Sequence, residues 1–239
     1  MILPVALISA IFYISAALGS EESFHLSEEI SNTNNQMKTV DPCPERQTKN
    51  IEFHGEMFAF YRDIREIQIP GTDPFKVLCC TNGNYGSKWM KVFYRLGSSK
   101  LFNRTYEDYE RGFGNVGING TDEFFIGLKQ LHLLMNENPH ELMVTTMENV
   151  FQRRTCNHFV VGSQNEGYML KSIGNCTGNA NVLFPKQGST FSTFDRDEDG
   201  FPDRNLAEEV GFGWWFDPSM SNIRDYVGLY IHMYIRKID

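Results

Sequence analysis

An acidic segment holds the residues with the clearest capacity for chemistry. Its carboxylates occupy alternate positions before a glycine, and a further carboxylate follows: Asp195, Asp197, Asp199, Gly200 and Asp203. Hard cations such as Ca²⁺ take about six to eight oxygen ligands from a flexible loop, and this spacing offers carboxylates together with freely turned carbonyls. The segment predicts a metal-binding loop, and a solvated acidic turn is the alternative that the local pattern leaves open. An EF-hand is disfavoured, because Leu206 stands where that loop needs a bidentate Glu.

Patterns typical of catalysis are missing from the sequence. There is no Gly-x-Ser-x-Gly turn and no phosphate-binding glycine loop, and His140 and Glu141 lack the second His of a zinc-binding HExxH pair. His132 lies within an apolar helical pattern, where a half-buried structural histidine is expected rather than a catalytic base. We therefore expect no enzymatic activity.

The beginning of the chain predicts export from the cell. Residues 1–20 carry no charged side chain and end in small residues, which is typical of a signal peptide, with an uncleaved membrane anchor as the alternative. Residues 21–42 are polar and acidic and predict a flexible arm, after which a globular domain is expected over residues 43–239. The net charge of −8 argues against a nucleic-acid partner. We expect a secreted, extracellular protein with no membrane span in the mature chain.

Sequons and cysteines agree with this prediction. Three sequons, at Asn103, Asn119 and Asn175, suit a protein that passes through a glycosylating compartment. Secretion would also permit disulfides, and the cysteines are five: Cys43, Cys79, Cys80, Cys156 and Cys176. At least one thiol must therefore stay free or pair with another molecule.

A predicted hairpin allows one disulfide to be derived from geometry. Residues 159–161 and 168–173 have the pattern of two strands joined by a turn over residues 164–167. If Val161 lies opposite Lys171, the same register places Cys156 opposite Cys176, at the spacing that a disulfide needs. A slip of one residue in the turn would break this pairing.

The remaining pattern predicts short strands and two helices. Strands are expected over residues 57–61, 75–78, 89–94, 143–146 and 229–236, and helices over residues 105–111, ending at Gly112, and 124–135. The sequence thus predicts an α+β domain in which antiparallel sheet dominates.

Several of these stretches, taken in order, resemble the fibrinogen C-terminal domain that fibrinogens, ficolins, tachylectins and angiopoietins share. The stretches that carry the resemblance are Thr105–Asn115, Asp122–Leu134, Asn138–Leu142, Gly178–Ala180, Phe191–Asp197 and Gly213–Trp215. The resemblance runs from about Cys43 to Tyr226, and beyond Tyr226 the sequence is shorter than the family pattern. It implies a small disulfide-closed N-terminal portion, a central antiparallel sheet with short helices, and a loop-rich C-terminal portion that holds calcium and a ligand pocket.

The resemblance also assigns residues. Cys43 and Cys79 are similar to the family's first disulfide, which leaves Cys80 as the odd thiol, either free or available for a covalent dimer. The family's calcium site implies ligands from the side chains of Asp197 and Asp199 and from the backbone of Phe201. One extra residue follows Phe201, so the carboxylate of Asp203 is expected to replace the last carbonyl ligand.

The departures from the family pattern affect the ligand pocket. The second family disulfide is absent, because Leu206 and Ser219 stand at its two positions. The ficolin-like acetyl-group pocket resembles a site made of that second Cys, a following His and nearby aromatics. Its places here are taken by Ser219 and Met220, beside Trp214 and Trp215. Paired aromatics beside a core more often pack than bind sugar.

Two functions are consistent with these observations, and fold alone does not choose between them. One is a secreted recognition module, similar to the angiopoietin-like branch, that binds a protein or glycoprotein partner such as a receptor and holds a structural calcium. The other is a calcium-dependent lectin of ficolin or tachylectin type that recognises acetylated glycans in innate defence. The altered pocket favours the first function, and the retained acidic loop is compatible with both.

Overall fold

The computed structural model describes residues 42–45, 60–82, 85–147, 150–179, 183–220, 222 and 226–238. The expected signal peptide, nearly all of the expected arm and the first residues of the strand predicted at 57–61 lie outside these ranges. In the described ranges, no helix has the length and apolarity needed to cross a bilayer.

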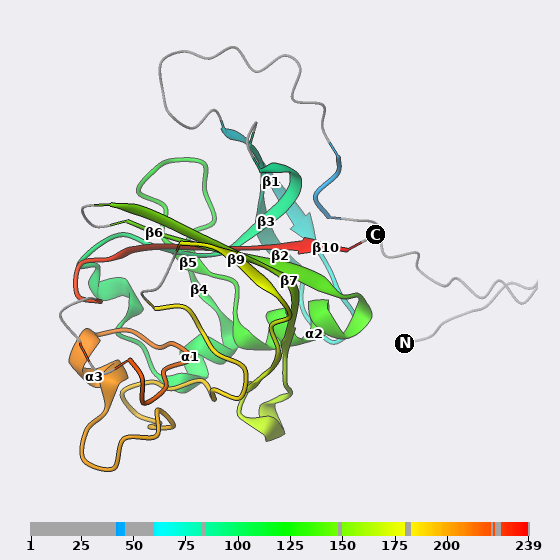
Figure 1. Ribbon diagram of the computed structural model, residues 1–239. Coiled ribbons are helices and arrows are strands. Elements are labelled where there is room, and N and C mark those ends of the chain that lie inside the picture. The colour runs from blue at the N-terminus through cyan, green and yellow to red at the C-terminus, as the bar shows by residue number, and fades with distance from the viewer. Residues whose placement is uncertain are drawn as a thin grey trace, which may run out of the picture. The chain divides into compact units, whose positions relative to one another are not determined.

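An antiparallel sheet of ten strands organises the described domain. Its main path runs β1-β2-β3-β10-β6-β7-β8, and β4, β5 and β9 pair beside this path. The path strands are β1 (Phe60–Ile67), β2 (Phe75–Asn82), β3 (Gly86–Arg95), β10 (Tyr230–Lys237), β6 (His140–Met147), β7 (Phe151–Val161) and β8 (Leu170–Ser172). The short side strands are β4 (Phe113–Gly114), β5 (Phe124–Phe125) and β9 (Cys176–Gly178). Strand β10 thus lies in the middle of the sheet, between β3 and β6, as Figure 1 shows in red.

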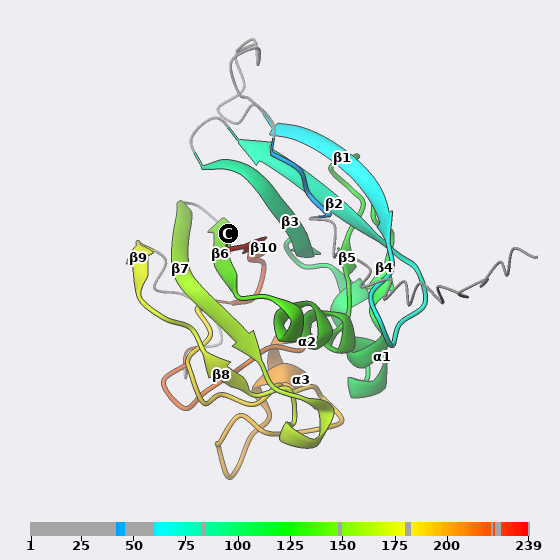
Figure 2. The ribbon, with the colours of Figure 1, turned by 90° about the vertical axis from the view of Figure 1, so that its right-hand side faces the viewer.

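Within the described ranges, three short α-helices lie on one side of this sheet, as Figure 1 and Figure 2 both show. They are α1 (Tyr106–Arg111), α2 (Leu128–Glu137) and α3 (Leu206–Val210), and two 3-10 turns, η2 (Lys100–Phe102) and η3 (Gln164–Glu166), accompany them. Helix α1 begins where the Thr105 side chain accepts a hydrogen bond from the Asp108 N–H, and it ends at Gly112, where φ is 88°. This agrees with the predicted helix. A β-rich α+β fold is therefore confirmed.

The second predicted helix was too long at its start. Phe124 and Phe125 form β5, in register with Tyr94 and Phe93 of β3, and the helix begins only at Leu128. Gly127 separates the two elements with a φ of 110°, which a helix does not accommodate. Apolar spacing alone did not distinguish the two structures, because pairing with β3 overrides the local helical preference of these residues.

The core between the sheet and the helices is strongly aromatic. The Phe93 ring on β3 lies 4.7 Å from the Phe102 ring and 5.2 Å from the Trp214 ring, centroid to centroid. Phe191 lies 4.8 Å from Trp215 in an edge-to-face arrangement. All of these side chains are buried, so the loops after residue 183 are anchored to the sheet by their own aromatic residues.

Both expected disulfides are present. Cys156 lies opposite Cys176 in the ladder between β7 and β9, and the two are bonded. The register near the turn differs from the expectation, because a bulge places Val161 opposite Leu170 rather than opposite Lys171. The ladder returns to the expected register beyond the bulge, which is why the cysteines still meet.

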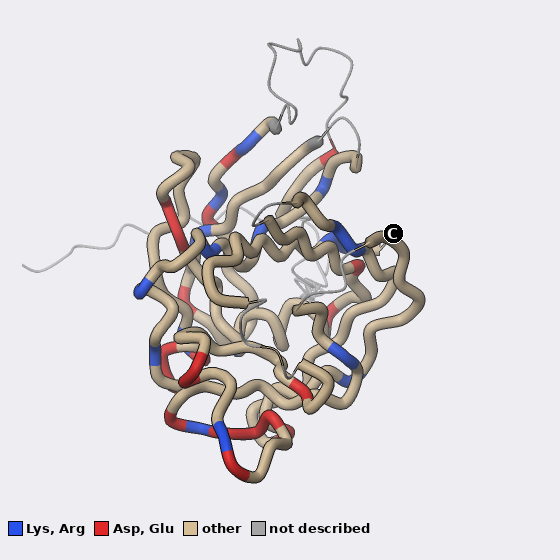
Figure 3. The backbone as a smooth tube through the Cα atoms, turned by 60° about the vertical axis from the view of Figure 1, so that its left-hand side comes forward, with Lys and Arg blue, Asp and Glu red and all other residues tan. Residues whose placement is uncertain are grey.

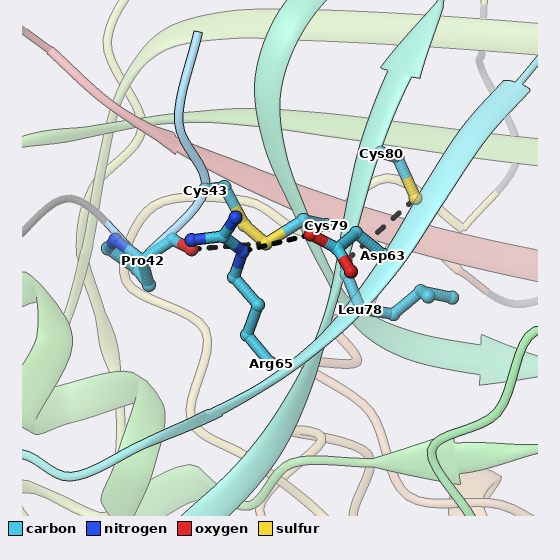
Figure 4. Close-up of a disulfide and its surroundings, with 7 residues drawn as sticks. All are labelled: Pro42, Cys43, Asp63, Arg65, Leu78, Cys79 and Cys80. Atoms are coloured by element: carbon cyan, nitrogen blue, oxygen red, sulfur yellow. Dashed lines mark hydrogen bonds and ion pairs between the residues drawn. A yellow bond between two sulfur atoms is a disulfide. The ribbon is translucent and has the colours of Figure 1, made fainter. Parts of the chain in front are cut away.

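The second bridge joins Cys43 to Cys79 across a sequence separation of 36 residues (Figure 4). Cys80, the next residue on β2, is buried and not in a disulfide. Since successive side chains of a strand point to opposite faces, the Cys80 thiol faces away from the bridge. Burial raises the pKa of this thiol, although the charges of Lys91 and Arg62 act in the opposite direction.

Candidate functional site

The acidic loop is held together by its most buried carboxylate. Asp199 is only 1% exposed. One of its oxygens accepts a hydrogen bond from the Phe201 N–H at 2.8 Å, and the other accepts from the Leu206 N–H at 2.7 Å. Leu206 is the first residue of α3, so a single carboxylate joins the loop to the start of this helix.

Asp197 lies beside Asp199 on the exposed side of the loop. Its carboxylate accepts a long hydrogen bond, 3.4 Å, from the Asp199 N–H. Partial burial and the neighbouring charge of Asp199 raise the pKa of Asp197, which outweighs this hydrogen bond. Two carboxylates therefore lie close enough to repel each other, and a divalent cation would relieve that repulsion.

The other acidic residues of the segment are arranged differently. Asp195 turns to the start of α1, where its carboxylate accepts a hydrogen bond from the Tyr106 N–H at 2.9 Å. The same carboxylate accepts from the hydroxyl of Thr193, two residues before it, at 2.7 Å. Asp203 is exposed and Phe201 is half-buried. The loop can be followed in Figure 3 as the stretch in which acidic and basic positions alternate at the lower edge of the tube.

The residues present fit a calcium ion in part. Asp197 and Asp199 supply adjacent carboxylates, one of them deeply buried. Within the described ranges, no three Asp, Glu, His or Cys side chains are grouped as a site made only of side chains would need. Calcium accepts backbone carbonyls as ligands, so the Phe201 carbonyl would have to contribute. The calcium site and the ligand roles of Asp197, Asp199, Phe201 and Asp203 all stay predictions.

The two tryptophans of the expected ligand pocket belong to the core. Trp214 and Trp215 are both 0% exposed. The Trp214 indole N–H donates to the Leu183 carbonyl at 3.1 Å, and the Trp215 indole N–H donates to the Tyr168 carbonyl at 2.8 Å. Their ring faces and their polar groups are thus engaged inside the protein, which makes them packing residues in this conformation.

The other two pocket residues form part of a closed turn. Met220 is buried, and its N–H donates to the Asp217 carbonyl at 2.9 Å. Ser219 is exposed, and its N–H donates to the Asp217 carboxylate at 2.8 Å. The Lys186 ammonium pairs with the same carboxylate at 3.1 Å and donates to the Ser219 hydroxyl. Partial burial opposes ionisation of Asp217, but its bonds with Ser219 and Lys186 hold its pKa below the ordinary value.

Two residues that sequence reasoning did not select shape these loops. Lys186 joins the turn that replaces the expected pocket, and its partner Asp217 lies 31 positions away, so no local pattern indicates the contact. Asn205 caps α3 by accepting from the Glu208 N–H at 3.0 Å, and it donates to the Thr193 and Phe194 carbonyls of the acidic loop. The Asn205 cap could have been predicted, because Asn three positions before Glu208 at the start of an apolar run is a helix-start signature.

The three sequon asparagines are all exposed. Asn103 follows η2, Asn119 lies in a turn, and Asn175 directly precedes β9. Their glycosylation stays a prediction. Each asparagine is nevertheless at a position where a bulky sugar would extend into solvent.

Comparisons with known proteins agree with this architecture. The family model described as the fibrinogen beta and gamma chains, C-terminal globular domain, matches residues 53–236. The human fibrinogen alpha chain is 34% identical over an alignment of 168 residues, and the match covers 64% of this protein and 19% of that relative. The protein therefore spans about a fifth of the alpha chains that it matches.

Solved structures show the same fold. The fibrinogen-like globe domain of human ANGPTL6 superposes with a TM-score of 0.63 at 22% identity, covering 75% of this protein and 90% of that domain. The lamprey fibrin D-dimer, complexed with the peptide ligand Gly-His-Arg-Pro-amide, gives a TM-score of 0.59 at 19% identity, covering 74% of this protein and 69% of the matched one. From the family match over residues 53–236, this protein belongs to the family of C-terminal globular domains found in the fibrinogen beta and gamma chains.

Proposed function

We propose that this protein is a secreted, extracellular recognition domain that binds a protein or glycoprotein partner. The observation that carries the proposal is the closed turn of Lys186, Asp217 and Ser219, together with the complete burial of Trp214 and Trp215. A small polar ligand needs a preformed concave site with a few unengaged hydrogen-bonding groups. Here Lys186, Ser219 and one carboxylate oxygen of Asp217 are bonded to one another, and the other oxygen of Asp217, which has no hydrogen-bond partner, is buried.

The family supports a binding role rather than catalysis. Solved structures of this fold include a lamprey fibrin complexed with a peptide ligand. That likeness is one of fold only, so neither the peptide nor its binding site is transferred to this protein.

In this proposal, calcium has a structural role. The ion would be held by Asp197 and Asp199, with the Phe201 carbonyl and the Asp203 carboxylate as further ligands. It would supply positive charge to a loop whose carboxylates otherwise repel each other. Because Asp199 also binds the first N–H of α3, calcium at this place would stabilise the entire segment from the loop to the helix.

The alternative is a calcium-dependent lectin for acetylated glycans. The paired carboxylates of Asp197 and Asp199 are compatible with this function. Calorimetric titration with N-acetylglucosamine in millimolar calcium separates the two functions. We expect no measurable binding to the wild-type protein. Micromolar affinity that disappears in a chelator would support the lectin instead.

A cell-binding experiment tests the partner directly. A fluorescent tetramer of the secreted protein is applied to a panel of cells that are untreated, treated with trypsin, or treated with periodate to oxidise sugars. We expect binding that trypsin abolishes and periodate preserves. Binding that periodate abolishes and that N-acetylglucosamine displaces would contradict a protein partner.

A further inference from the structure

The sequon at Asn175 contains a cysteine that the folded protein uses. Its middle residue, Cys176, is bonded to Cys156. Its last residue, Thr177, lies opposite Thr155 in the ladder between β7 and β9. The backbone of Asn175 is fixed as well, since its N–H donates to the Asn157 side chain at 2.8 Å and its carbonyl accepts from the Asn157 N–H at 3.1 Å.

The other two sequons contain no cysteine and are held by hydrogen bonds alone. The Asn103 N–H donates to the Lys100 carbonyl at 3.2 Å, and Thr105 caps the helix that follows it. The Asn119 N–H donates to the Asp122 carboxylate at 3.1 Å. The carbonyl of Gly120, the middle residue of that sequon, also accepts from the Tyr94 hydroxyl at 2.5 Å. Hydrogen bonds open and close locally, so they would leave both sequons accessible in an incomplete polypeptide. Only the Asn175 sequon is locked by a covalent bond to a distant residue, 20 positions away.

Glycosyl transfer needs this segment free. The Asn side-chain nitrogen forms a bond to the anomeric carbon of an oligosaccharide, the bond from that carbon to a lipid diphosphate breaks, and the amide proton is lost to a base. The transferring enzyme must hold the Asn amide and the Thr hydroxyl in its own site at the same time. A sequon that is bonded at its middle residue and paired along β9 cannot enter such a site.

Disulfide formation removes that freedom. The thiols of Cys156 and Cys176 lose two protons and two electrons to the disulfide of a thiol oxidoreductase, which becomes a dithiol. Chain motion does not limit this step, because loops of about ten residues close within about 100 ns, whereas disulfide formation takes seconds or longer. The local oxidant therefore sets how long the sequon stays available.

We propose that glycosylation of Asn175 and closure of the Cys156–Cys176 bridge compete for the same segment. Asn175 receives a glycan only while the bridge is open, so the secreted protein consists of two populations, with and without a sugar beside β9. The inference rests on the proposed export of the protein through an oxidising, glycosylating compartment.

The experiment compares site occupancy in total cellular protein from mammalian cells that express all 239 residues. Sugars are trimmed to a single residue by endoglycosidase H, and each sequon peptide is quantified by mass spectrometry. Cys156→Ser keeps the sequon intact and removes the bridge. Cys43→Ser is the matched control, because it opens the other disulfide and leaves β7 and β9 untouched. Thr177→Ala destroys the sequon, so its Asn175 peptide carries no sugar and serves as the unglycosylated reference.

We expect partial occupancy of Asn175 in the wild type and at least a twofold rise in Cys156→Ser. Cys43→Ser should leave Asn175 at the wild-type level, and Asn103 and Asn119 should be unchanged in every variant. A brief dithiothreitol pulse on wild-type cells should reproduce the effect of Cys156→Ser without any substitution. Because transfer occurs on incomplete polypeptides, a variant that later fails to fold still gives a result.

Three outcomes would overturn the competition while leaving export intact, provided that Asn103 or Asn119 carries sugar. They are full occupancy of Asn175 in the wild type, no rise in Cys156→Ser, and an equal rise in Cys43→Ser. Absence of sugar from all three sequons in all variants would instead overturn the proposed export, and the competition with it.

Discussion

Among single residues, Asp199 is expected to have the largest effect on the acidic loop. Asp199→Ala removes a buried charged acceptor from two backbone N–H groups, so we expect it to lower the free energy of unfolding by about 2 to 4 kcal/mol. Wild-type protein should melt at a higher temperature in millimolar calcium than in EDTA, because an ion bound only to the native state at about 100 times its Kd adds about 2.7 kcal/mol. Differential scanning calorimetry measures both effects.

Glu137→Ala is the control for this prediction, since it removes an exposed carboxylate at the end of α2. This variant should keep the calcium shift, and Asp199→Ala should lose it. Identical melting of the wild type with and without calcium would refute the metal site. It would leave the hydrogen-bonding role of Asp199 to be judged from the stability of the variant alone.

Lys91 is expected to contribute to the alkaline pH dependence of stability. It is 3% exposed, with its ammonium 4.1 Å from the Tyr94 ring centroid, and desolvation lowers its pKa to about 8. The unfolded state therefore binds more protons than the native protein between about pH 8 and 10.5, and this residue makes the native state more stable as pH rises. Buried Cys80 acts in the opposite direction, because its raised pKa keeps the native thiol protonated.

Comparison with Lys91→Met isolates this contribution. Between about pH 7 and pH 9.5, we expect the unfolding free energy of the wild type to rise by about 2 kcal/mol relative to that of the variant, since each pKa unit corresponds to about 1.4 kcal/mol. Urea titrations in a Cys80→Ser background, which prevents disulfide exchange at high pH, measure the difference. A difference that is constant with pH would show that Lys91 is solvated in solution.

Cys80 is expected to be unreactive in the native protein. Its thiol is buried and its pKa is raised by desolvation, and both effects lower the amount of accessible thiolate. Iodoacetamide at about pH 8 should modify one thiol per molecule in guanidinium chloride and nearly none in buffer. A covalent dimer that disappears in Cys80→Ser would contradict this prediction and would restore the intermolecular role that the odd number of cysteines suggests.

At the scale of elements, α3 and the acidic loop should respond together. Asn205→Ala removes the helix cap and the two donor contacts to the loop, and we expect a loss of about 1 to 2 kcal/mol. Asn205→Asp keeps the capping oxygen but not the donor, so it separates the two contributions. If Asn205→Asp matches the wild type in urea denaturation, the contacts to Thr193 and Phe194 add nothing.

Elements with a complete local signal were predicted well. Thr105 and Gly112 mark both ends of α1, and runs rich in apolar and aromatic residues mark β3 and β10. Prediction was wrong where a contact with another element decides the structure, as for Phe124 and Phe125, which pair with β3. The bulge at Val161 is a second example, since no residue in the turn specifies it.

The residues of the candidate site were likewise predicted where the signal is local and missed where a distant contact decides the structure. The residues of the acidic loop were selected because carboxylate spacing is a local property. Lys186 was not selected, because its contact with Asp217 depends on how two distant loops meet. The sequence did indicate that the tryptophans favour packing, and their burial supports that interpretation.

At the scale of the whole domain, β10 determines whether the sheet forms. Ile231, Met233 and Ile235 are completely buried, and the strand pairs with β3 on one side and β6 on the other. A protein that lacks residues 229–239 should therefore show no cooperative unfolding transition by circular dichroism in urea. A protein that begins at Val40 should retain one, because the residues from Val40 onward form a separate compact unit. Cooperative unfolding of the first variant would contradict a sheet held together by β10.

The central position of β10 also determines when the domain can fold during its synthesis. Strands β1 to β3 and β6 to β9 leave the ribosome before β10, which pairs with both β3 and β6, has been made. Until then β3 and β6 each have an unpaired edge. Long-range pairing of this kind is slow and exposes the nascent polypeptide to aggregation, so the yield of protein should depend on chaperones that protect it. A premature stop codon anywhere before residue 230 would leave no smaller working version of the domain.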